Sequence, residues 1–376
     1  MDIGVYIHIP FCMSKCYYCD FNSMPDKSRY DAYINALISE INLTSAERKN
    51  DEVKTLFIGG GTPTVLPPYL LDKLLDKVQS SFNIKDGAEW TIEANPGTLD
   101  IEKINILKKY KISRISLGMQ STHDRLLKII GRRHTFEDFK NSIQLIRDNT
   151  NYDINADIMF ALPTQTLDEF KATINTVVDF NLEHISVYSL IIEEGTIFGD
   201  MYDKGELKEV DDDLDREMYH YAINRLKEAG YSQYEVSNFA RPGKECRHNI
   251  IYWECEPYVG LGLGAHSLYG DIRYYNNENI DEYIKNSDDL SKLRCLEEKL
   301  TEESKMEEFI ILGFRMNKGI SKTDFYKKFT KNIYDVYGKQ IKYWTDLGII
   351  IEHEDRLYLS DYGQDISNEV FVSFIS

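Results

Sequence analysis

Basic residues and long apolar runs are both scarce in this chain. Its 376 residues include 44 lysines and arginines against 62 aspartates and glutamates, which gives a formal net charge of −18. Such an acidic chain is poorly suited to binding nucleic acid or anionic membranes non-specifically. No apolar run is long enough to span a bilayer, and the first residues lack the basic leader and cleavage site of a secretory signal. The sequence therefore predicts a cytoplasmic protein with no nucleic-acid partner.

Cysteine is also scarce, which argues against a disulfide framework. Only six cysteines are present, and Cys12, Cys16 and Cys19 fall within eight positions. In a reducing compartment such a group is more typical of a metal site than of disulfide bonds. The remaining three are scattered, and we interpret them as isolated buried or surface thiols: Cys246, Cys255 and Cys295.

Short apolar strands alternate with amphipathic helices through the first half of the chain. Strands are predicted at Gly4–Ile9, Thr55–Ile58, Trp90–Glu93, Arg114–Leu117, Asn155–Phe160 and His184–Ser189. Helices are predicted between them at about Ser28–Thr44, Pro68–Ser80, Asp100–Tyr110, Phe136–Asp148 and Leu167–Phe180. This order predicts an α/β fold with a parallel sheet, either open or curled into a barrel. In barrel-like folds, sites form at the rim where the strands end.

The second half has a different character. A helix at Asp213–Gly230 precedes a Gly- and aromatic-rich stretch, Tyr231–Asp271, that we interpret as loops and short strands, and then a polar connector, Asn276–Lys299. Further helices and a hairpin are predicted at Ser304–Phe314, Lys322–Phe329, Ile333–Leu347, Ile349–Glu352 and Arg356–Leu359. Helices followed by a hairpin indicate a winged-helix-like unit. DNA binding, the usual role of such a unit, is disfavoured because no basic helix is present.

The spacing Cys-x3-Cys-x2-Cys from Cys12 to Cys19 follows the first predicted strand directly. Closely spaced thiolates on one loop can converge on a cubane iron–sulfur cluster. Three ligands for four irons leave one iron open to a small chelating ligand. A structural zinc ion is an alternative, but it would need a fourth cysteine or histidine nearby, and the neighbouring Tyr17, Tyr18 and Asp20 are not soft ligands.

Three consecutive glycines, Gly59 to Gly61, follow the second predicted strand and precede Thr62 and Pro63. Without a Cβ atom, glycines let the backbone approach a polar ligand closely. By itself a glycine triplet is more often a turn. Its place at the end of the second strand favours a ligand-binding role here.

The cysteine spacing, with an aromatic residue before the last cysteine, resembles the radical SAM superfamily. In that superfamily the open iron chelates S-adenosylmethionine, and an electron from the cluster cleaves the sulfonium to give a 5′-deoxyadenosyl radical. The sequences of the motifs resemble those of the coproporphyrinogen-dehydrogenase-like branch still more closely, and this similarity continues to GLGLGAHS near residue 268. The matching stretches are YIHIPFC, CYYCDF, FIGGGTPT, IEANPGT, RISLGMQS, GRRH, ADIMFALPTQT, SVYSLIIEEGT and YEVSNFARPGKECRHNIIYW.

This resemblance implies a partial (β/α)6 TIM-like barrel with a 4Fe–4S cluster on Cys12, Cys16 and Cys19. It also implies an S-adenosylmethionine pocket lined by Tyr6, Tyr18, Gly60, Gly61, Thr62, Glu93, Gln120, Arg132 and Asp157. Carboxylates can accept from ribose hydroxyls or an amino group, and an arginine can pair with a carboxylate. Alternatively, Glu93 and Asp157 only cap the helices that follow their strands. Arg132 is assigned to the pocket in preference to Arg133 only because of its position in the motif.

Two groups within this branch differ at a few positions. The dehydrogenases oxidatively decarboxylate coproporphyrinogen III, and they usually carry a fourth cysteine where this chain has Phe21, together with an arm before the first strand. Both departures favour the other group, heme chaperones that pass heme to acceptors such as respiratory enzymes. The alternatives that stay open are a coproporphyrinogen dehydrogenase and a radical enzyme with an unrelated substrate.

The heme chaperones share an HNxxYW motif, which this chain matches with His248, Asn249, Tyr252 and Trp253. Imidazole is a good axial ligand for heme iron, and flat aromatic side chains suit a porphyrin face. The resemblance therefore implies that these four residues bind heme. Alternatively, the histidine is an ordinary buried residue, or Cys246 supplies a thiolate ligand. The roles of His266, and of an alanine at position 161 where the family usually has glycine, stay undecided.

The predicted organisation has three parts. Residues 1–230 form the core barrel, 231–298 an aromatic and Gly-rich extension with a connector, and 299–376 a small helical, winged-helix-like C-terminal domain. The expected partners are heme and heme-accepting proteins. Family precedent adds an electron donor (flavodoxin, ferredoxin or an NADH-linked protein), a homodimer, and peripheral membrane contact only through partners.

Overall fold

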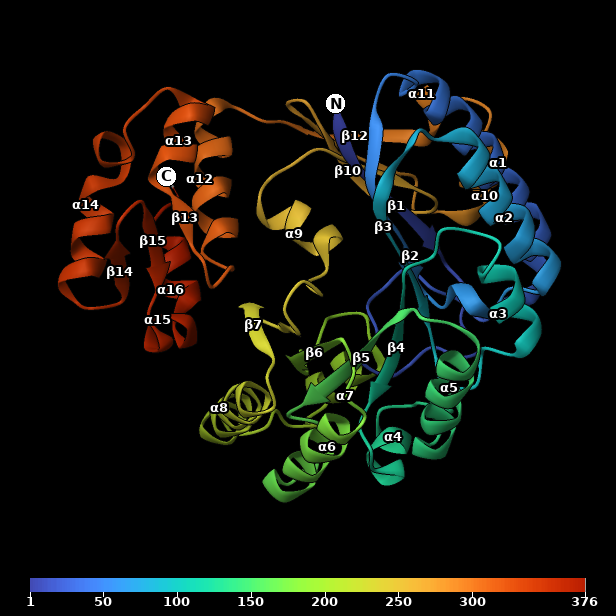
Figure 1. Cartoon of the computed structure of the whole chain (residues 1–376), viewed down its shortest axis with the longest axis horizontal. Helices are drawn as coiled ribbons and strands as arrows, with labels where there is room; N and C mark the ends of the chain where they lie inside the picture. The colour runs from blue at the N-terminus through green and yellow to red at the C-terminus, as the bar shows by residue number, and fades with distance from the viewer. Residues whose placement is uncertain (376) are drawn as a thin grey trace.

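A computed structural model describes residues 1–375 of the chain. Within these residues the larger sheet has twelve strands in the order β12-β11-β10-β9-β1-β2-β3-β4-β5-β6-β8-β7, and its edges do not pair with each other, so the sheet is curved but open (Figure 1). Six parallel neighbours form its centre: β1 (Asp2–Ile9), β2 (Glu52–Gly60), β3 (Ile84–Ala94), β4 (Arg114–Gln120), β5 (Asp153–Phe160) and β6 (His184–Ser189). The predicted partial (β/α)6 barrel is confirmed.

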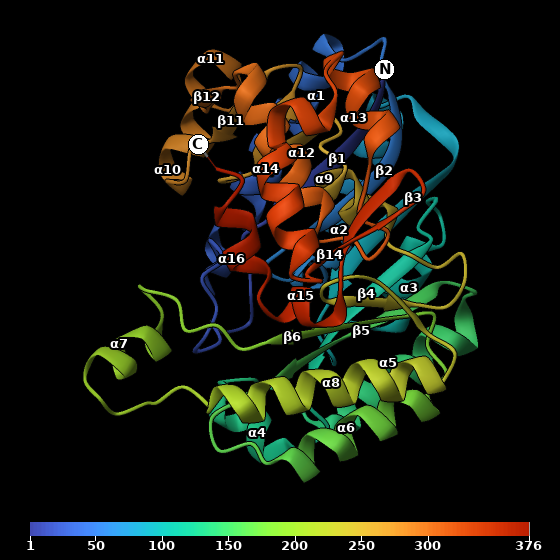
Figure 2. The same ribbon diagram turned by 90° about the vertical axis from the view of Figure 1, so that its left-hand side faces the viewer.

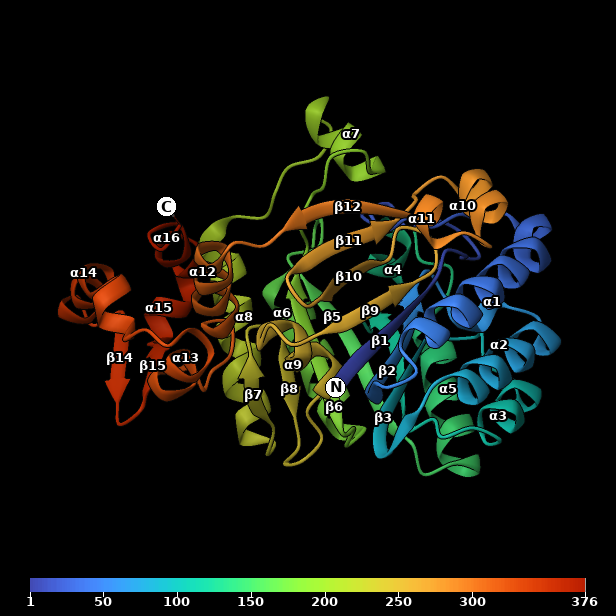
Figure 3. The same cartoon turned by 90° about the horizontal axis from the view of Figure 1, so that it is seen from above.

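Helices cover the outer face of this sheet (Figures 1 and 3). They are α1 (Tyr30–Glu47), α2 (Pro68–Ser81), α3 (Ile101–Leu107), α5 (Phe136–Asn149), α6 (Leu167–Asp179) and α8 (Asp212–Glu228). In α2, Leu70, Leu71, Leu74, Leu75 and Val78 are buried, which is the spacing of one apolar helix face against a sheet. Two short helices, α4 (Asp124–Ile129) and α7 (Ile197–Asp203), were not predicted.

The segment after α8 extends the sheet at both edges. On one edge, β8 (Asn238–Ala240) pairs antiparallel with β6, and β7 (Ser232–Glu235) pairs antiparallel with β8. On the other edge, β9 (Tyr258–Leu261) pairs parallel with β1, and antiparallel strands follow: β10 (His266–Tyr269), β11 (Ile272–Asn276) and β12 (Arg294–Lys299). The helix α9 (Arg247–Trp253) links the two edges across the open side of the sheet (Figure 3).

The prediction of a connector at Asn276–Lys299 is wrong in part. Between β11 and the C-terminal unit lie two short helices, α10 (Ile280–Asn286) and α11 (Leu290–Leu293), and then strand β12. The pattern in β12 is polar because the strand is an exposed sheet edge: four of its six residues, Leu296 to Lys299, are exposed. An edge strand of this kind lacks the apolar alternation that marks a half-buried one.

The C-terminal unit has its own hydrophobic core, which runs from Met306 to Phe374, whereas the core of the sheet runs from Ile3 to Leu293. Its elements are α12 (Glu302–Gly313), β13 (Ile320–Ser321), α13 (Lys322–Phe329), α14 (Ile333–Asp346), β14 (Ile350–His353), β15 (Arg356–Leu359), α15 (Asp361–Asp365) and α16 (Ser367–Val372). The predicted helices and hairpin are confirmed, and the hairpin forms a three-stranded sheet with β13. Figure 2 shows this unit in front of the sheet. Within residues 1–375, no helix combines the length and apolar character that a membrane crossing needs.

A buried carboxylate joins the added strands to the first helix. Glu40 on α1 accepts hydrogen bonds from the Tyr283 hydroxyl at 2.6 Å, the Asn276 amide at 2.6 Å and the Gly262 backbone N–H at 2.8 Å. All of these groups are buried. Burial raises the pKa of Glu40 to about 7. Because the three donors are buried, water cannot replace the Glu40 carboxylate as their acceptor, and the junction depends on this residue.

We predict that Glu40→Ala lowers the free energy of unfolding by about 3 kcal/mol, because it leaves three buried donors without an acceptor. Chemical denaturation followed by circular dichroism measures this. The control is Glu47→Ala on the same helix. Glu47 is exposed and pairs with Arg294, and such surface pairs contribute roughly 0–1 kcal/mol. Equal losses for the two variants would contradict the prediction.

Candidate functional site

A cavity of about 400 Å³ lies inside the curve of the sheet. It runs from the cysteine loop and the carboxyl ends of β2 and β4 to Arg114 and His184, at the amino ends of β4 and β6. Ten of the predicted cluster and S-adenosylmethionine residues line it: Cys12, Cys16, Cys19, Tyr18, Gly60, Gly61, Glu93, Gln120, Arg132 and Asp157. The fold thus brings residues 145 positions apart to one site.

The cysteine loop is fixed at its base. Phe11 is fully buried, with its ring centroid 4.5 Å from that of Tyr30 and 5.3 Å from that of Tyr33. The Cys12 N–H donates to the Met24 carbonyl at 3.1 Å, and this hydrogen bond joins the two ends of the loop. Burial raises the pKa of the Cys12, Cys16 and Cys19 thiols. Binding a metal to such thiols therefore releases protons.

These three thiols suit a cluster better than one ion. In the part of the chain that the structure describes, no three His, Cys, Asp or Glu side chains gather closely enough to hold a single metal ion. The ligands of a cubane cluster bind different iron atoms, so their sulfur atoms need not meet at one point. The donor set therefore fits a cluster with three protein ligands.

The glycine loop packs the end of β2 against the end of β1. Gly60 has a φ of +102°, and a Cβ atom there would lie 2.4 Å from the His8 ring. A Cβ atom on Gly61 would lie 2.5 Å from the Phe11 carbonyl oxygen. The Gly60 N–H donates to Glu93 Oε2 at 3.1 Å, and the Gly61 N–H donates to the Ile9 carbonyl at 2.8 Å. Both glycines line the cavity, but the chain itself uses their N–H groups.

Arg132 lines the cavity, whereas Arg133 is exposed. Its Nη1 donates to Asn95 Oδ1 at 2.7 Å and its Nη2 donates to the Tyr18 hydroxyl at 2.6 Å. The buried Nε has no hydrogen-bond partner among the described residues. This nitrogen is buried against the protein, and the two terminal nitrogens make the arginine's contacts at the cavity.

Three further polar side chains face the same space. Asp157 accepts from Asn155 Nδ2 at 2.7 Å, and Gln120 Oε1 accepts from the Tyr188 hydroxyl at 3.0 Å. Gln120 has a φ of +66°, an uncommon conformation for a residue with a side chain. Burial, reinforced by the negative charge of Asp157, raises the pKa of Glu93 to about 8.

Two predicted residues lie behind the cavity wall rather than in it. The Tyr6 hydroxyl is hydrogen-bonded to His8 Nδ1 at 3.0 Å. Thr62 Oγ1 accepts from Asn95 Nδ2 at 2.7 Å and lies 3.6 Å from Cys12 Sγ. Neither lines the cavity, so each acts on the site through a neighbour.

The heme-motif residues lie on α9 and face different surroundings. Asn249 lines the cavity. His248 is 1% exposed; its Nδ1 is hydrogen-bonded to Thr55 Oγ1 and its Nε2 to the Tyr252 hydroxyl, both at 2.8 Å. Burial lowers the pKa of His248 to about 3. Both ring nitrogens are thus engaged, and neither is free for an iron atom. Trp253 lies at the other end of α9, against the C-terminal unit.

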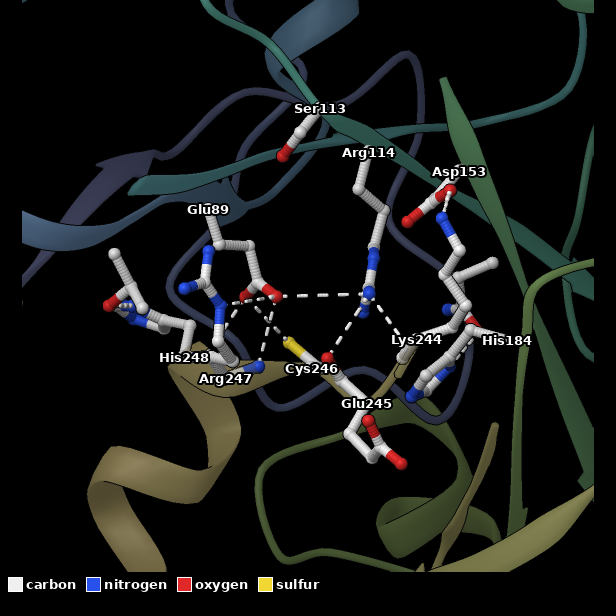
Figure 4. Close-up of polar contacts among 12 residues, drawn as sticks. Glu89, Ser113, Arg114, Asp153, His184, Lys244, Glu245, Cys246, Arg247 and His248 are labelled. Atoms are coloured by element: carbon white, nitrogen blue, oxygen red, sulfur yellow. Dashed lines mark hydrogen bonds and ion pairs between the residues drawn. The ribbon is translucent and has the colours of Figure 1, made fainter. Parts of the chain in front are cut away.

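A buried carboxylate that sequence analysis missed holds the start of α9 (Figure 4). Glu89 on β3 accepts from the backbone N–H groups of Arg247 and His248, both at 3.0 Å. The Cys246 thiol also donates to it at 3.5 Å, and Arg114 lies 3.8 Å away. A carboxylate at a helix amino end is favourable because the free N–H groups point toward it. No clear signal in the sequence marks this residue, because β3 carries three other charged residues, Lys85, Asp86 and Glu93.

The inner end of the cavity carries polar atoms without partners. Arg114 donates through Nη2 to the Lys244 and Glu245 carbonyls, but its Nε and Nη1 have no partner among the described residues. Thr91 Oγ1 and Asn238 Oδ1 are likewise buried and unpartnered. Water or a bound group commonly satisfies such atoms. Polar side chains thus line the cavity at both of its ends.

Comparison with known proteins agrees with this geometry. The family model of the radical SAM superfamily matches residues 6–177, and that of the HemN C-terminal domain matches residues 300–366. The chain is 38% identical over 374 residues to the heme chaperone HemW of Bacillus subtilis, which covers 99% of each chain. It is 32% identical over 379 residues to the heme chaperone HemW of Escherichia coli, covering 100% of this chain and 98% of the relative. The chain belongs to the HemW family.

A solved protein structure has the same fold as this chain. The chain is similar to coproporphyrinogen III oxidase (HemN) from Escherichia coli, a radical SAM enzyme, with a TM-score of 0.86 and 21% identity over 100% of this chain and 90% of the other. At this identity the likeness shows the fold. The predicted radical SAM resemblance is confirmed, and the superfamily implies a 4Fe–4S cluster and S-adenosylmethionine.

Three undecided positions now have a structural description. Ala161 has a φ of +55°, which explains why the family usually has glycine there, since side chains disfavour that conformation. Phe21 is 58% exposed and lines the cavity, so it stands where a fourth cysteine would face the site. His266 is exposed and pairs with Glu297 at 3.0 Å, outside the cavity.

The raised pKa of Glu93 yields a prediction on pH dependence. The folded protein keeps a proton on Glu93 up to about pH 8, whereas the ordinary pKa is 4.5. The contribution of Glu93 to the free energy of unfolding is therefore fully present below pH 4.5 and decreases as the pH rises toward 8. We expect Glu93→Gln, which stays neutral, to become more stable relative to wild type over this range, by at most about 1.4 kcal/mol per pH unit.

Denaturation at several pH values measures this difference. The control is Glu102→Gln, an exposed position on α3, which should follow wild type throughout. Parallel pH profiles for wild type and Glu93→Gln would show that Glu93 is ionised at neutral pH.

Proposed function

We propose that this protein binds heme and passes it to acceptor proteins, with a 4Fe–4S cluster and S-adenosylmethionine held in the barrel. The observation that carries the proposal is the placement of α9. Of its HNxxYW residues, Asn249 lines the first cavity and Trp253 lines a cavity at the C-terminal unit, in a chain that matches HemW relatives along their full length. A heme site on α9 would therefore lie near the end of the first cavity that is opposite the cysteine loop.

We assign the cluster to Cys12, Cys16 and Cys19, whose thiols face one cavity. When bound, the cluster and S-adenosylmethionine supply one-electron chemistry. The protein's own residues suit the remaining groups of that ligand. Arg132 can donate to its carboxylate through the terminal nitrogens that bond Asn95 and Tyr18, and Glu93 or Asp157 can accept from its amino group or ribose hydroxyls. Tyr18, Gly60, Gly61 and Gln120 complete the proposed S-adenosylmethionine site, and Tyr6 and Thr62 support it from behind the cavity wall.

The finer assignments are also proposals. We assign a core barrel to residues 1–230, an extension to 231–298 and a C-terminal domain to 299–376. The separate core of the C-terminal unit supports the boundary near 299, whereas residues of the extension pack in the core of the barrel. We propose that an electron donor and a second copy of the chain are partners, and that the protein is cytoplasmic. The position of Phe21 at the cavity supports a chaperone over a coproporphyrinogen III dehydrogenase, the second candidate.

We predict that Cys16→Ala prevents cluster assembly. Anaerobic reconstitution with iron and sulfide, followed by iron analysis and absorption spectroscopy, should show loss of nearly all cluster iron because one of three ligands is removed. The control is Cys295→Ala on β12, which lies outside the cavity and should retain the full cluster. A full cluster in Cys16→Ala would overturn the assignment.

The decisive functional measurement uses the reconstituted protein. We expect stoichiometric heme uptake, followed by transfer to a heme-free acceptor protein. Incubation with coproporphyrinogen III, S-adenosylmethionine and a reductant should produce no protoporphyrinogen. Formation of protoporphyrinogen together with methionine would instead identify an enzyme of heme synthesis.

A further inference from the structure

The two ends of the HNxxYW helix differ in accessibility. At its start, His248 is buried, with both ring nitrogens hydrogen-bonded, and its ring stacks on Phe57 at a centroid distance of 5.3 Å. At its end, Trp253 lines a second cavity of about 320 Å³. This volume is within the range of small-molecule sites. The motif thus faces two cavities, the first through Asn249 and the second, beside the C-terminal unit, through Trp253.

This second cavity, which we name the α9 cleft, lies between α9 and the C-terminal unit. Its apolar wall consists of Trp253, Phe309, Met316 and Ile320. The Arg315 guanidinium lies 4.5 Å from the Trp253 ring centroid, and the buried indole N–H has no partner among the described residues. An aromatic and aliphatic wall of this kind suits one face or edge of a flat macrocycle.

The two walls of the α9 cleft are joined by backbone hydrogen bonds. The Val236 N–H donates to the Arg315 carbonyl at 3.1 Å, and the Asn317 N–H donates to the Tyr234 carbonyl at 3.0 Å. These bonds connect the segment before α9 to the chain that leaves α12. The cleft is thus built by both parts of the protein, and its walls are held together without a ligand.

Charged residues of both signs line the α9 cleft, and two of its cations have no carboxylate partner among the described residues. Three acidic residues line it, Glu254, Glu256 and Asp324, and each forms an ion pair with a lysine: Lys318, Lys54 and Lys327, respectively. Two further cations line it without a carboxylate partner among residues 1–375. Lys328 Nζ donates to the Cys255 carbonyl at 3.3 Å, and Arg356 Nη1 donates to the Gly319 carbonyl at 3.2 Å.

We propose that the α9 cleft is the heme-docking site, with the porphyrin against Trp253 and its two propionates toward Lys328 and Arg356. This proposal rests on the proposed heme function and assigns its location. Heme combines a flat apolar ring with two carboxylates, and the cleft combines an aromatic wall with two cations that lack carboxylate partners. His248 is then a positioning residue that holds α9 through Thr55 and Tyr252.

The test is a spectrophotometric heme titration of the cluster-loaded full chain. Lys328→Gln/Arg356→Gln should weaken heme affinity by at least about tenfold, since each charge-assisted hydrogen bond contributes to binding. The matched control is Lys339→Gln/Lys342→Gln on α14, which removes the same charge at exposed positions outside the cleft. Trp253→Ala should also weaken binding, whereas Trp253→Phe keeps a flat ring and should largely restore it. Circular dichroism checks that each variant folds.

The outcomes separate the two proposals. If wild type fails to bind heme, the proposed function fails. If wild type binds heme and the Lys328→Gln/Arg356→Gln variant binds equally well, the heme lies elsewhere and the α9 cleft is not its site. Weakening by the control pair as large as that by the cleft pair would likewise overturn the assignment, because it would reflect net charge alone.

Discussion

The close approach of the carboxyl ends of β1 and β2 is the constraint on which the rest of the site depends. At Gly60 and Gly61 the backbone of β2 comes so near His8 and Phe11 that a Cβ atom would overlap with them. The same contact places the Gly60 N–H beside Glu93 and fixes the base of the cysteine loop. A glycine motif associated with ligand contact thus first serves to assemble the site, because the chain uses its N–H groups.

A second constraint acts from the opposite end of the strands. Glu89 is buried at the amino end of α9, where it accepts two backbone hydrogen bonds and lies near Arg114. A carboxylate can remain buried there because the helix end and the arginine offset its charge. Glu89 thereby also fixes the position of His248, because the His248 backbone N–H is one of the two donors. The orientation of the HNxxYW residues is therefore set from inside the sheet, which leaves Trp253 to face the C-terminal unit.

Much of the fold followed from patterns local in the sequence. β6 and α13 begin and end where the apolar spacing predicted, because each forms a periodic segment with clear boundaries. The helix α9 and strand β12 were missed for different reasons. α9 is a short helix with no side-chain cap of its own, since its cap comes from Glu89, about 160 residues earlier. β12 is an exposed edge whose polar residues carry no period-two signal.

The sequence by itself determined the chemistry of the site: three cysteines at a fixed spacing, a glycine loop and a set of polar residues in family order. These are local features, so no knowledge of distant contacts was needed to recognise them. Only the tertiary structure decided which residues reach the cavity. It placed Tyr6 and Thr62 behind the wall, engaged both nitrogens of His248, and opened Trp253 toward another part of the chain. Burial and hydrogen-bond partners depend on segments distant in sequence, and spacing along the chain does not contain that information.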